Sequence, residues 1–162
     1  MSYDPRSIAN ILLDLADKRG VALTNLAINE ILYFLHAWYL AKFNSPLLDA
    51  KIEAWDYGPV VREVYSEFKK YGSEPISGRA HRFDIDRLEK IIATADLSSG
   101  DMSFIESQFE KYSGYTAGRL VSISHEKGGP WDRVYNESGR VNPGMEISDD
   151  LIRDYFVQQT RH

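Results

Sequence analysis

The side chains that could support catalysis or metal binding are few and widely spaced. The histidines are His36, His81, His125 and His162. None of them follows the HExxH spacing that places two imidazoles on one face of a helix as zinc ligands. The chain has no cysteine, which excludes disulfides, thiolate metal ligands and cysteine nucleophiles. We therefore expect no metal ion, no cofactor and no catalytic residue.

His125 is the histidine best placed for chemistry, because it precedes Glu126 and a Gly-Gly-Pro-Trp turn. Its imidazole could act as a general base with a nearby carboxylate, as in a small hydrolase or transferase, or it could bind a group of a partner. The structural alternative is that the ring ties the turn to the end of the preceding helix. No serine-nucleophile motif and no pair of carboxylates accompanies it. His36 lies in a strongly apolar segment, where a packed, hydrogen-bonded histidine is more usual than a catalytic one.

Length, composition and charge are those of a soluble globular protein. The 162 residues are enough for one compact domain with a hydrophobic core, and the 43% hydrophobic and 27% charged fractions are ordinary. The formal net charge of −5 gives no long-range attraction to phosphate backbones, so direct nucleic-acid binding is not expected. The N-terminus has no signal-peptide pattern, and the most apolar run, residues 31–41, is too short to cross a bilayer. We expect a cytoplasmic protein that does not enter membranes and folds by itself or with a second copy.

Apolar residues at helical spacing predict two helices in the first third of the chain. The first has Asp4 as N-cap and Pro5 at its first position, and Gly20 ends it. Thr24 is predicted to cap a longer helix that ends before Pro46. That second helix is apolar over much of its circumference, which is typical of a central, buried helix.

The middle of the chain predicts shorter elements. Residues 51–57 alternate in part and end at Gly58-Pro59, which indicates a short extended piece or a turn that leads into another helix. Pro59 fits the first position of a third helix that Gly72 ends. Residues 73–83 are predicted to be a mobile loop, and residues 84–92 contain a short helix that starts at position 84 or 86.

The last third predicts further helices and one loop. Ser98 or Ser99 opens a helix that ends at Gly114, and Thr116 caps another that runs to about His125, although residues 121–125 could also form a strand. Residues 128–144 are predicted to be loop, and Ser148 begins a last helix. The predicted fold is therefore mainly α, a compact single-domain bundle of six or seven helices over residues 1–162, with at most a small β hairpin.

Aromatic residues make up 12% of the chain, with ten tyrosines. Trp55, Tyr57, Tyr65 and Trp131 lie near glycine-proline turns, and such rigid rings suit the anchors of a protein interface. Trp55 and Trp131 could equally fill the core, because tryptophan is mostly buried whatever its role.

Residues 31–64, ILYFLHAWYLAKFNSPLLDAKIEAWDYGPVVREV, resemble the SocA-like antitoxin family, also called the Panacea domain, which is represented among phage-associated and GepA-like proteins. The most specific part is EAWDYGPVVREVY, residues 53–65. LVSISHEKGGPW, residues 120–131, is similar to the family's serine-histidine segment leading to Pro-Trp. MEISDDLIRDYF, residues 145–156, is similar to its terminal helix, so the likeness covers about residues 26–156.

The resemblance implies an antitoxin that neutralises a co-encoded toxin protein by direct binding and, for some members, delivers the toxin to a protease. The motif residues then implied to bind the partner are Trp55, Tyr57, Gly58, Pro59, Tyr65, His125 and Trp131. Two charges depart from the family pattern: Glu30 stands where lysine is usual, and Glu126 where a small polar residue is common. These changes concern the identity of the partner more than the fold, so no relative's partner is carried over.

Overall fold

A long central helix organises the molecule. The computed structural model describes residues 2–137 and 145–160. Helix α1 (Pro5–Arg19) begins where the Asp4 carboxylate accepts a hydrogen bond from the Arg6 amide, and Gly20 ends it in a left-handed conformation. Helix α2 (Asn25–Phe43) begins at Thr24, whose hydroxyl oxygen accepts from the Ala27 amide. Both predicted starts are confirmed.

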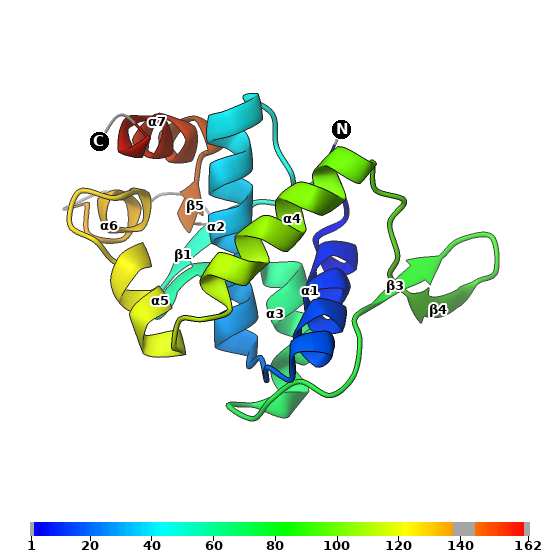
Figure 1. The fold of residues 1–162 in the computed structure, drawn as a ribbon. Coiled ribbons are helices and arrows are strands. Elements are labelled where there is room, and N and C mark those ends of the chain that lie inside the picture. Colours follow the sequence, from blue (N-terminus) through cyan, green and yellow to red (C-terminus); the bar gives the residue numbers. More distant parts are fainter. Residues whose placement is uncertain (1, 138–144, 161–162) are drawn as a thin grey trace.

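Helix α2 is buried along most of its length, as predicted from its apolar circumference. Around it lie α1, α3 (Arg62–Phe68), α4 (Ser99–Tyr112), α5 (Ala117–Ser124) and α7 (Asp149–Gln159), with α6 (Pro130–Tyr135) next to α7 (Figure 1). One continuous hydrophobic core joins these helices. The described residues thus form seven α-helices, which confirms a mainly α fold.

A small antiparallel sheet of strands β1 (Ile52–Trp55), β2 (Gly58–Val60) and β5 (Glu146–Ile147) lies beside α2, in the order β2-β1-β5. The extended piece predicted at 51–57 is therefore confirmed as β1. The prediction that Pro59 begins a helix is wrong, because Pro59 pairs with Ala54 across the sheet. The pairing keeps β2 extended, so α3 starts only at Arg62; a 3₁₀ turn, η1 (Lys69–Tyr71), then continues the helix to Gly72.

A β hairpin of strands β3 (His81–Asp84) and β4 (Glu89–Ile92) projects from the body (Figure 1), where a short helix was predicted. The helix prediction is wrong because Asp84 does not cap a helix. Its carboxylate accepts from the amides of Asp86 and Arg87 and closes a turn, and Leu88 then takes a positive φ of 53°. With the three-stranded sheet, the strand content exceeds the single hairpin expected.

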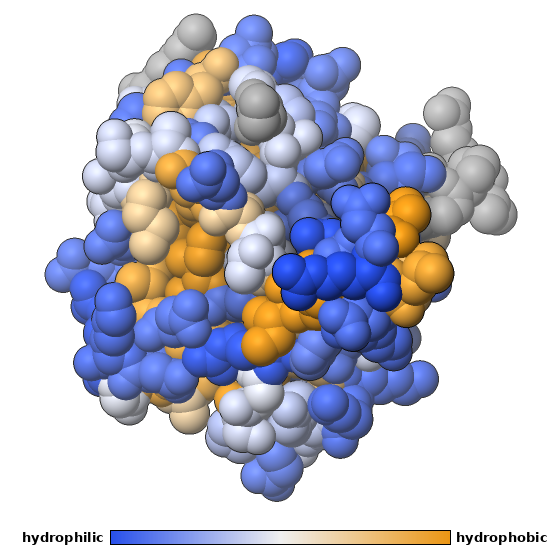
Figure 2. All heavy atoms as spheres, turned by 90° about the vertical axis from the view of Figure 1, so that its right-hand side faces the viewer, coloured by the Kyte–Doolittle hydropathy of each residue, from blue (hydrophilic) through white to orange (hydrophobic). Residues whose placement is uncertain are grey.

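The hairpin carries most of the exposed large hydrophobic side chains of the described chain. Phe83, Ile85, Leu88 and Ile92 are between 51% and 77% exposed. Figure 2, which looks onto the side from which the hairpin projects, shows hydrophobic surface among charged side chains. Isolated two-stranded hairpins are marginally stable in water, so this one needs an anchor.

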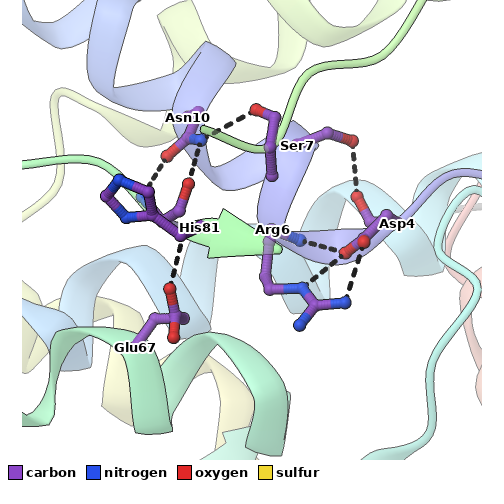
Figure 3. Close-up of polar contacts among 8 residues, drawn as sticks. Asp4, Arg6, Ser7, Asn10, Glu67 and His81 are labelled. Atoms are coloured by element: carbon purple, nitrogen blue, oxygen red, sulfur yellow. Dashed lines mark hydrogen bonds and ion pairs between the residues drawn. The ribbon is translucent and has the colours of Figure 1, made fainter. Parts of the chain in front are cut away.

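Asn10 of α1 provides that anchor. Its buried amide nitrogen donates to the carbonyls of Ala80 and Ala93, both at 2.9 Å, and its amide oxygen accepts from the Ala80 amide at 2.8 Å. Ala80 and Ala93 immediately flank β3 and β4, so one side chain holds both ends of the hairpin. Figure 3 shows Asn10 directed at this junction, with Glu67 of α3 accepting from the His81 amide on the other side. The loop predicted over 73–83 is thus fixed at its C-terminal end.

In the C-terminal part of the chain, the structure contains one helix, α6, where a loop was predicted. Residues 121–124 lie in α5, so the strand alternative is wrong. Residues 130–135 form α6 instead of loop, because Pro130 occupies the first turn and Trp131 buries its ring in the core. The remainder of that predicted loop, residues 138–144, lies outside the described residues. Helix α7 begins after Ser148, whose hydroxyl caps it as predicted.

Replacing Asn10 with alanine should release the hairpin from the body. The Ala80 amide and the Ala93 carbonyl would lose their partner, whereas the Ala80 carbonyl would keep its bond from the Ala93 amide. We expect the free energy of unfolding to fall by roughly 2 kcal/mol. Native-state hydrogen exchange should show faster exchange at Ala80 and along β3 and β4. The control is Asn136→Ala, which removes an exposed side-chain bond to Asp132 and should leave the hairpin amides unchanged. Unchanged protection in Asn10→Ala would refute the anchor.

Candidate functional site

Three rings from the most specific family motif meet on the surface beside the β1–β2 turn. The Trp55 ring meets Tyr65 of α3 edge-on, with 4.8 Å between ring centroids. Tyr57 is 48% exposed, and the neighbouring Tyr65 hydroxyl raises the pKa of Tyr57. We call Trp55, Tyr57 and Tyr65 the aromatic cluster. The structure thus brings these three predicted residues together.

A charged pair that the sequence did not reveal fixes the aromatic cluster. Arg62 donates two hydrogen bonds to the Glu53 carboxylate, at 3.0 and 2.7 Å, and its guanidinium lies 5.6 Å from the centre of the Trp55 ring. The same carboxylate accepts from Trp55 Nε1 at 3.0 Å. Arg62 lowers the pKa of Glu53, which therefore stays charged against the opposing effect of burial. The only sequence signal was that both residues lie within the motif.

A groove of about 280 Å³ runs from the aromatic cluster to the start of α2. Its walls include Tyr57 and Tyr65 on one side and Asn25, Leu26 and Asn29 on the other. Both asparagines are buried and bonded to the chain around α3: Asn25 donates to the Tyr65 carbonyl, and Asn29 accepts from the Val61 amide. The groove is therefore a rigid feature with an aromatic and an amide wall.

Gly58 and Pro59 are buried, so they position the aromatic cluster and do not line its surface. Gly58 has a φ of 132°, which L side chains rarely adopt. A Cβ atom there would stand 2.3 Å from Oε1 of Glu30 and 3.3 Å from Oγ of Ser124. The turn therefore requires glycine both for its backbone conformation and for its contact with α2.

Glu30 is fully buried in α2 next to this turn. Its Oε1 accepts a hydrogen bond from the Ser124 hydroxyl of α5 at 3.1 Å, and its Oε2 has no partner among the described residues. Burial raises the pKa of Glu30 to about 9, against the smaller opposing effect of the Ser124 bond. The carboxyl group is therefore neutral near pH 7, and α2 buries no charge at this position.

The second group of predicted residues forms a stack of rings. His125, which ends α5, lies 3.7 Å from Trp131 between ring centroids, and Trp131 lies 4.6 Å from Tyr135. Trp131 Nε1 donates to the Trp55 carbonyl at 2.7 Å and so joins the stack to the aromatic cluster, while the Tyr135 hydroxyl donates to Asp56. Trp131 is buried and belongs to the core, whereas Trp55 is half-buried. Tyr135 was missed because its helix was predicted as loop.

His125 ties α5 to α6 by stacking, as its structural interpretation predicted. Burial lowers its pKa, and its Nε2 is buried without a hydrogen-bond partner in the described chain. No described carboxylate is hydrogen-bonded to it, and Glu126 instead accepts from the Tyr155 hydroxyl at 2.8 Å. The acid–base pair required by the hydrolase or transferase alternative is therefore not assembled within residues 2–137 and 145–160.

His36 is a packed histidine, as its setting in α2 predicted. Its Nδ1 accepts from the Leu48 amide at 3.2 Å, and its Nε2 donates to Asp149 at 2.8 Å. Among the residues that the structure describes, no group of three or more potential ligands could hold a metal ion. None of the described helices has the length and apolar character needed to cross a membrane.

Comparison with known proteins places these features in a family. The family model "Antitoxin SocA-like, Panacea domain" matches residues 28–132, a span that contains Glu30, the aromatic cluster and Trp131. The chain belongs to the SocA-like antitoxin family. It is 36% identical over 156 residues to Antitoxin SocA of Caulobacter vibrioides (strain NA1000 / CB15N), covering 96% of this chain and 83% of that relative. The resemblance inferred from the sequence is confirmed. No solved structure matches the chain.

Replacing Gly58 with alanine should destabilise the protein much more than the same change at Gly72. Both glycines have positive φ, but a Cβ at Gly72 meets nothing within 4 Å, whereas at Gly58 it meets Glu30. We expect a loss of about 1 kcal/mol for Gly72→Ala from backbone strain alone, and of about 3 kcal/mol or more for Gly58→Ala. Urea unfolding of the two variants measures the difference, and equal losses would refute the close contact.

Glu30 should make the protein less stable as the pH rises. The folded state keeps the Glu30 proton up to about pH 9, whereas the unfolded chain releases it near the ordinary glutamate pKa of 4.5. Unfolding therefore releases a proton between these two pH values. Relative to Glu30→Gln, the wild type should therefore lose stability by up to about 1.4 kcal/mol per pH unit in this window. Urea unfolding of both proteins from pH 5 to 9 tests this. Parallel curves would contradict a raised pKa.

Proposed function

We propose that this protein neutralises a co-encoded toxin by binding it directly through the aromatic cluster. The observation that carries the proposal is the 36% identity to Antitoxin SocA over almost the whole chain. Its site is proposed from the motif residues, because Tyr57 is exposed and Trp55 and Tyr65 are half-buried beside it, within the family's most specific segment. The role is non-enzymatic, and the whole chain is proposed to act as one domain.

The geometry of the aromatic cluster suits an interface anchor. Tyr57 is exposed but held by Tyr65, and Trp55 is fixed between Tyr65 and Arg62. Rings that are already ordered lose little conformational entropy on binding, and Tyr, Trp and Arg are the residues most often found as interface hot spots. The groove beside the cluster gives a partner side chain a place to enter.

The test of function is expression of the neighbouring gene with and without this one. Neutralisation predicts that growth inhibition by the neighbouring product disappears when this protein is present, and that the two purified proteins form a complex. The amount of toxin in the rescued cells separates two routes. An unchanged amount indicates occlusion by binding, whereas depletion that needs a cellular protease indicates delivery of the toxin, the second route that the family resemblance implies. No complex and no rescue would refute the proposal.

Alanine at Tyr57 should weaken the toxin complex without unfolding the protein. The side chain is about half exposed, so its removal should change the melting temperature little, while a central anchor is worth on the order of 2 kcal/mol, or about thirtyfold in affinity. Tyr65→Ala should weaken binding similarly but also lower the melting temperature, because it uncovers Trp55.

The matched control for these variants is Phe43→Ala. Phe43 is 46% exposed but lies at the other end of α2 from the groove. Affinity by calorimetry, thermal melts and growth rescue are measured on the same variants. Full rescue and unchanged affinity in a stable Tyr57→Ala, Tyr65→Ala double variant would exclude the aromatic cluster as the binding surface. The next candidates would be His125 and Trp131.

A further inference from the structure

A second cavity, distinct from the groove, opens between α2, α4, α5 and α7. It has a volume of about 160 Å³, and its lining includes the rings of Tyr33, Phe34, Trp38, Tyr112, Tyr155 and Phe156. The rings hold one another in fixed orientations: Phe34 stacks on Tyr112 at 4.7 Å, and Trp38 meets Phe156 edge-on at 5.0 Å. An apolar cavity of about 150 Å³ binds benzene in another protein, so this one can hold a single six-membered ring.

One polar group in the lining of this cavity, the Tyr33 hydroxyl, has no hydrogen-bond partner among the described residues. Tyr33 is 1% exposed, and its hydroxyl makes no hydrogen bond to any described residue. Burial, with a smaller effect of the nearby Glu30, raises the pKa of Tyr33 well above its ordinary value, so the hydroxyl stays protonated. Buried hydroxyls are nearly always hydrogen-bonded, so one without a protein partner is expected to bond to a ligand group or an ordered water.

Three neighbouring polar side chains of the wall already donate hydrogen bonds. Trp38 Nε1 donates to the Tyr112 hydroxyl at 2.6 Å, the Tyr155 hydroxyl donates to Glu126, and the Ser124 hydroxyl donates to Glu30. A ligand in the cavity therefore meets aromatic surface on its sides and the Tyr33 hydroxyl as a polar group with no partner in the described chain, with Tyr115 and Gln159 also in the lining. A ring that carries one hydrogen-bonding substituent matches this arrangement.

The mouth of the cavity is charged and exposed. It includes Glu126 and Lys111, whose ammonium group lies 5.5 Å from the Trp38 ring and 5.1 Å from the Tyr112 ring. The interior holds one ring and no more, so the rest of any larger ligand must lie outside, against these charged side chains. A side chain that extends from a polypeptide has this shape.

We propose that the cavity receives one tyrosine side chain of the toxin, with its ring among the aromatic walls and its hydroxyl hydrogen-bonded to Tyr33. This assignment rests on the proposed function, because it names the partner as a protein toxin. Phenylalanine would fill the same space but leave the Tyr33 hydroxyl unpaired, so the site distinguishes the two residues. Burial of an aromatic anchor in a preformed pocket is the usual form of an interface hot spot.

The cavity can be tested without the toxin, using p-cresol and toluene as the side chains of tyrosine and phenylalanine. Titration followed by amide NMR should show shifts confined to the residues around the cavity, with p-cresol binding about fivefold more tightly than toluene. Tyr33→Phe should abolish this preference and keep toluene binding. The control, Tyr71→Phe, removes a tyrosine hydroxyl outside the cavity and should leave the preference intact. Absence of binding, equal affinities in the wild type, or a preference that survives Tyr33→Phe would overturn the proposal and leave an ordered water as the partner of Tyr33.

A competition experiment tests the identity of the occupant. Saturating p-cresol should weaken the complex with the co-encoded toxin severalfold, and toluene should do so less. Binding of p-cresol with no effect on the complex would overturn the toxin tyrosine as occupant while leaving the proposed function intact. If the wild type forms no toxin complex even without p-cresol, the proposed function fails and the assignment to a toxin tyrosine fails with it, whereas the measured preference for phenol stands.

Discussion

The structure depends on how the buried central helix satisfies its polar side chains. Helix α2 is enclosed by other elements, yet it carries Asn25, Asn29, Glu30 and His36, all of them buried. A buried polar group without a partner costs about 1–3 kcal/mol, so each of these side chains has to find one. The two asparagines bond to the segment around α3, Glu30 bonds to α5, and His36 bonds to the start of α7. The helix that contributes most to the apolar core therefore also fixes the positions of the segments around it.

These pairings place the candidate site. Asn29 accepts from the Val61 amide just before α3, and Asn25 donates to the Tyr65 carbonyl within α3, which holds Tyr65 against Trp55. Glu30 accepts a hydrogen bond from Ser124 and so fixes the end of α5, and His125, which caps this helix, begins the stack of rings. His36 binds Asp149 at the start of α7. The surface proposed to bind a toxin is thus held rigid by hydrogen bonds of buried side chains in α2. Substitution of these buried side chains should alter toxin binding although they do not contact the toxin.

The sequence predicted the parts of this arrangement that local signals control. The caps at Asp4, Thr24 and Ser148, and the burial of α2, follow from residue types within a few positions of each other. The errors lie where distant contacts decide the local structure. Pro59 was expected to start a helix, but pairing with β1 keeps it in a strand. The hairpin was expected to be helical, but Asn10, about 70 residues away, holds its ends.

The site shows the same division between local and distant information. Trp55, Tyr57 and Tyr65 could be selected because they are aromatic and close in sequence. Their support by Arg62 and Glu53 needed the fold of the strand and helix that carry them. The hydrogen-bond partners of the polar side chains in α2 could not be predicted from the sequence. Glu30 and Ser124, for example, are separated by 94 positions, and the residues around neither one indicate the other. That the Tyr33 hydroxyl has no protein partner could likewise not be predicted, because Tyr33 lies in a run of apolar residues.

The contact between Gly58 and Glu30 constrains how this lineage can change. A side chain at position 58 collides with the carboxyl group at position 30, whereas a shorter residue at position 30 removes the collision and leaves a small void. Shortening residue 30 does not make position 58 free to change, because the φ of 132° disfavours a side chain there even without the collision. Descendants that keep a long residue at position 30 are held to glycine at position 58, and the sharp turn that presents Tyr57 is inherited with it.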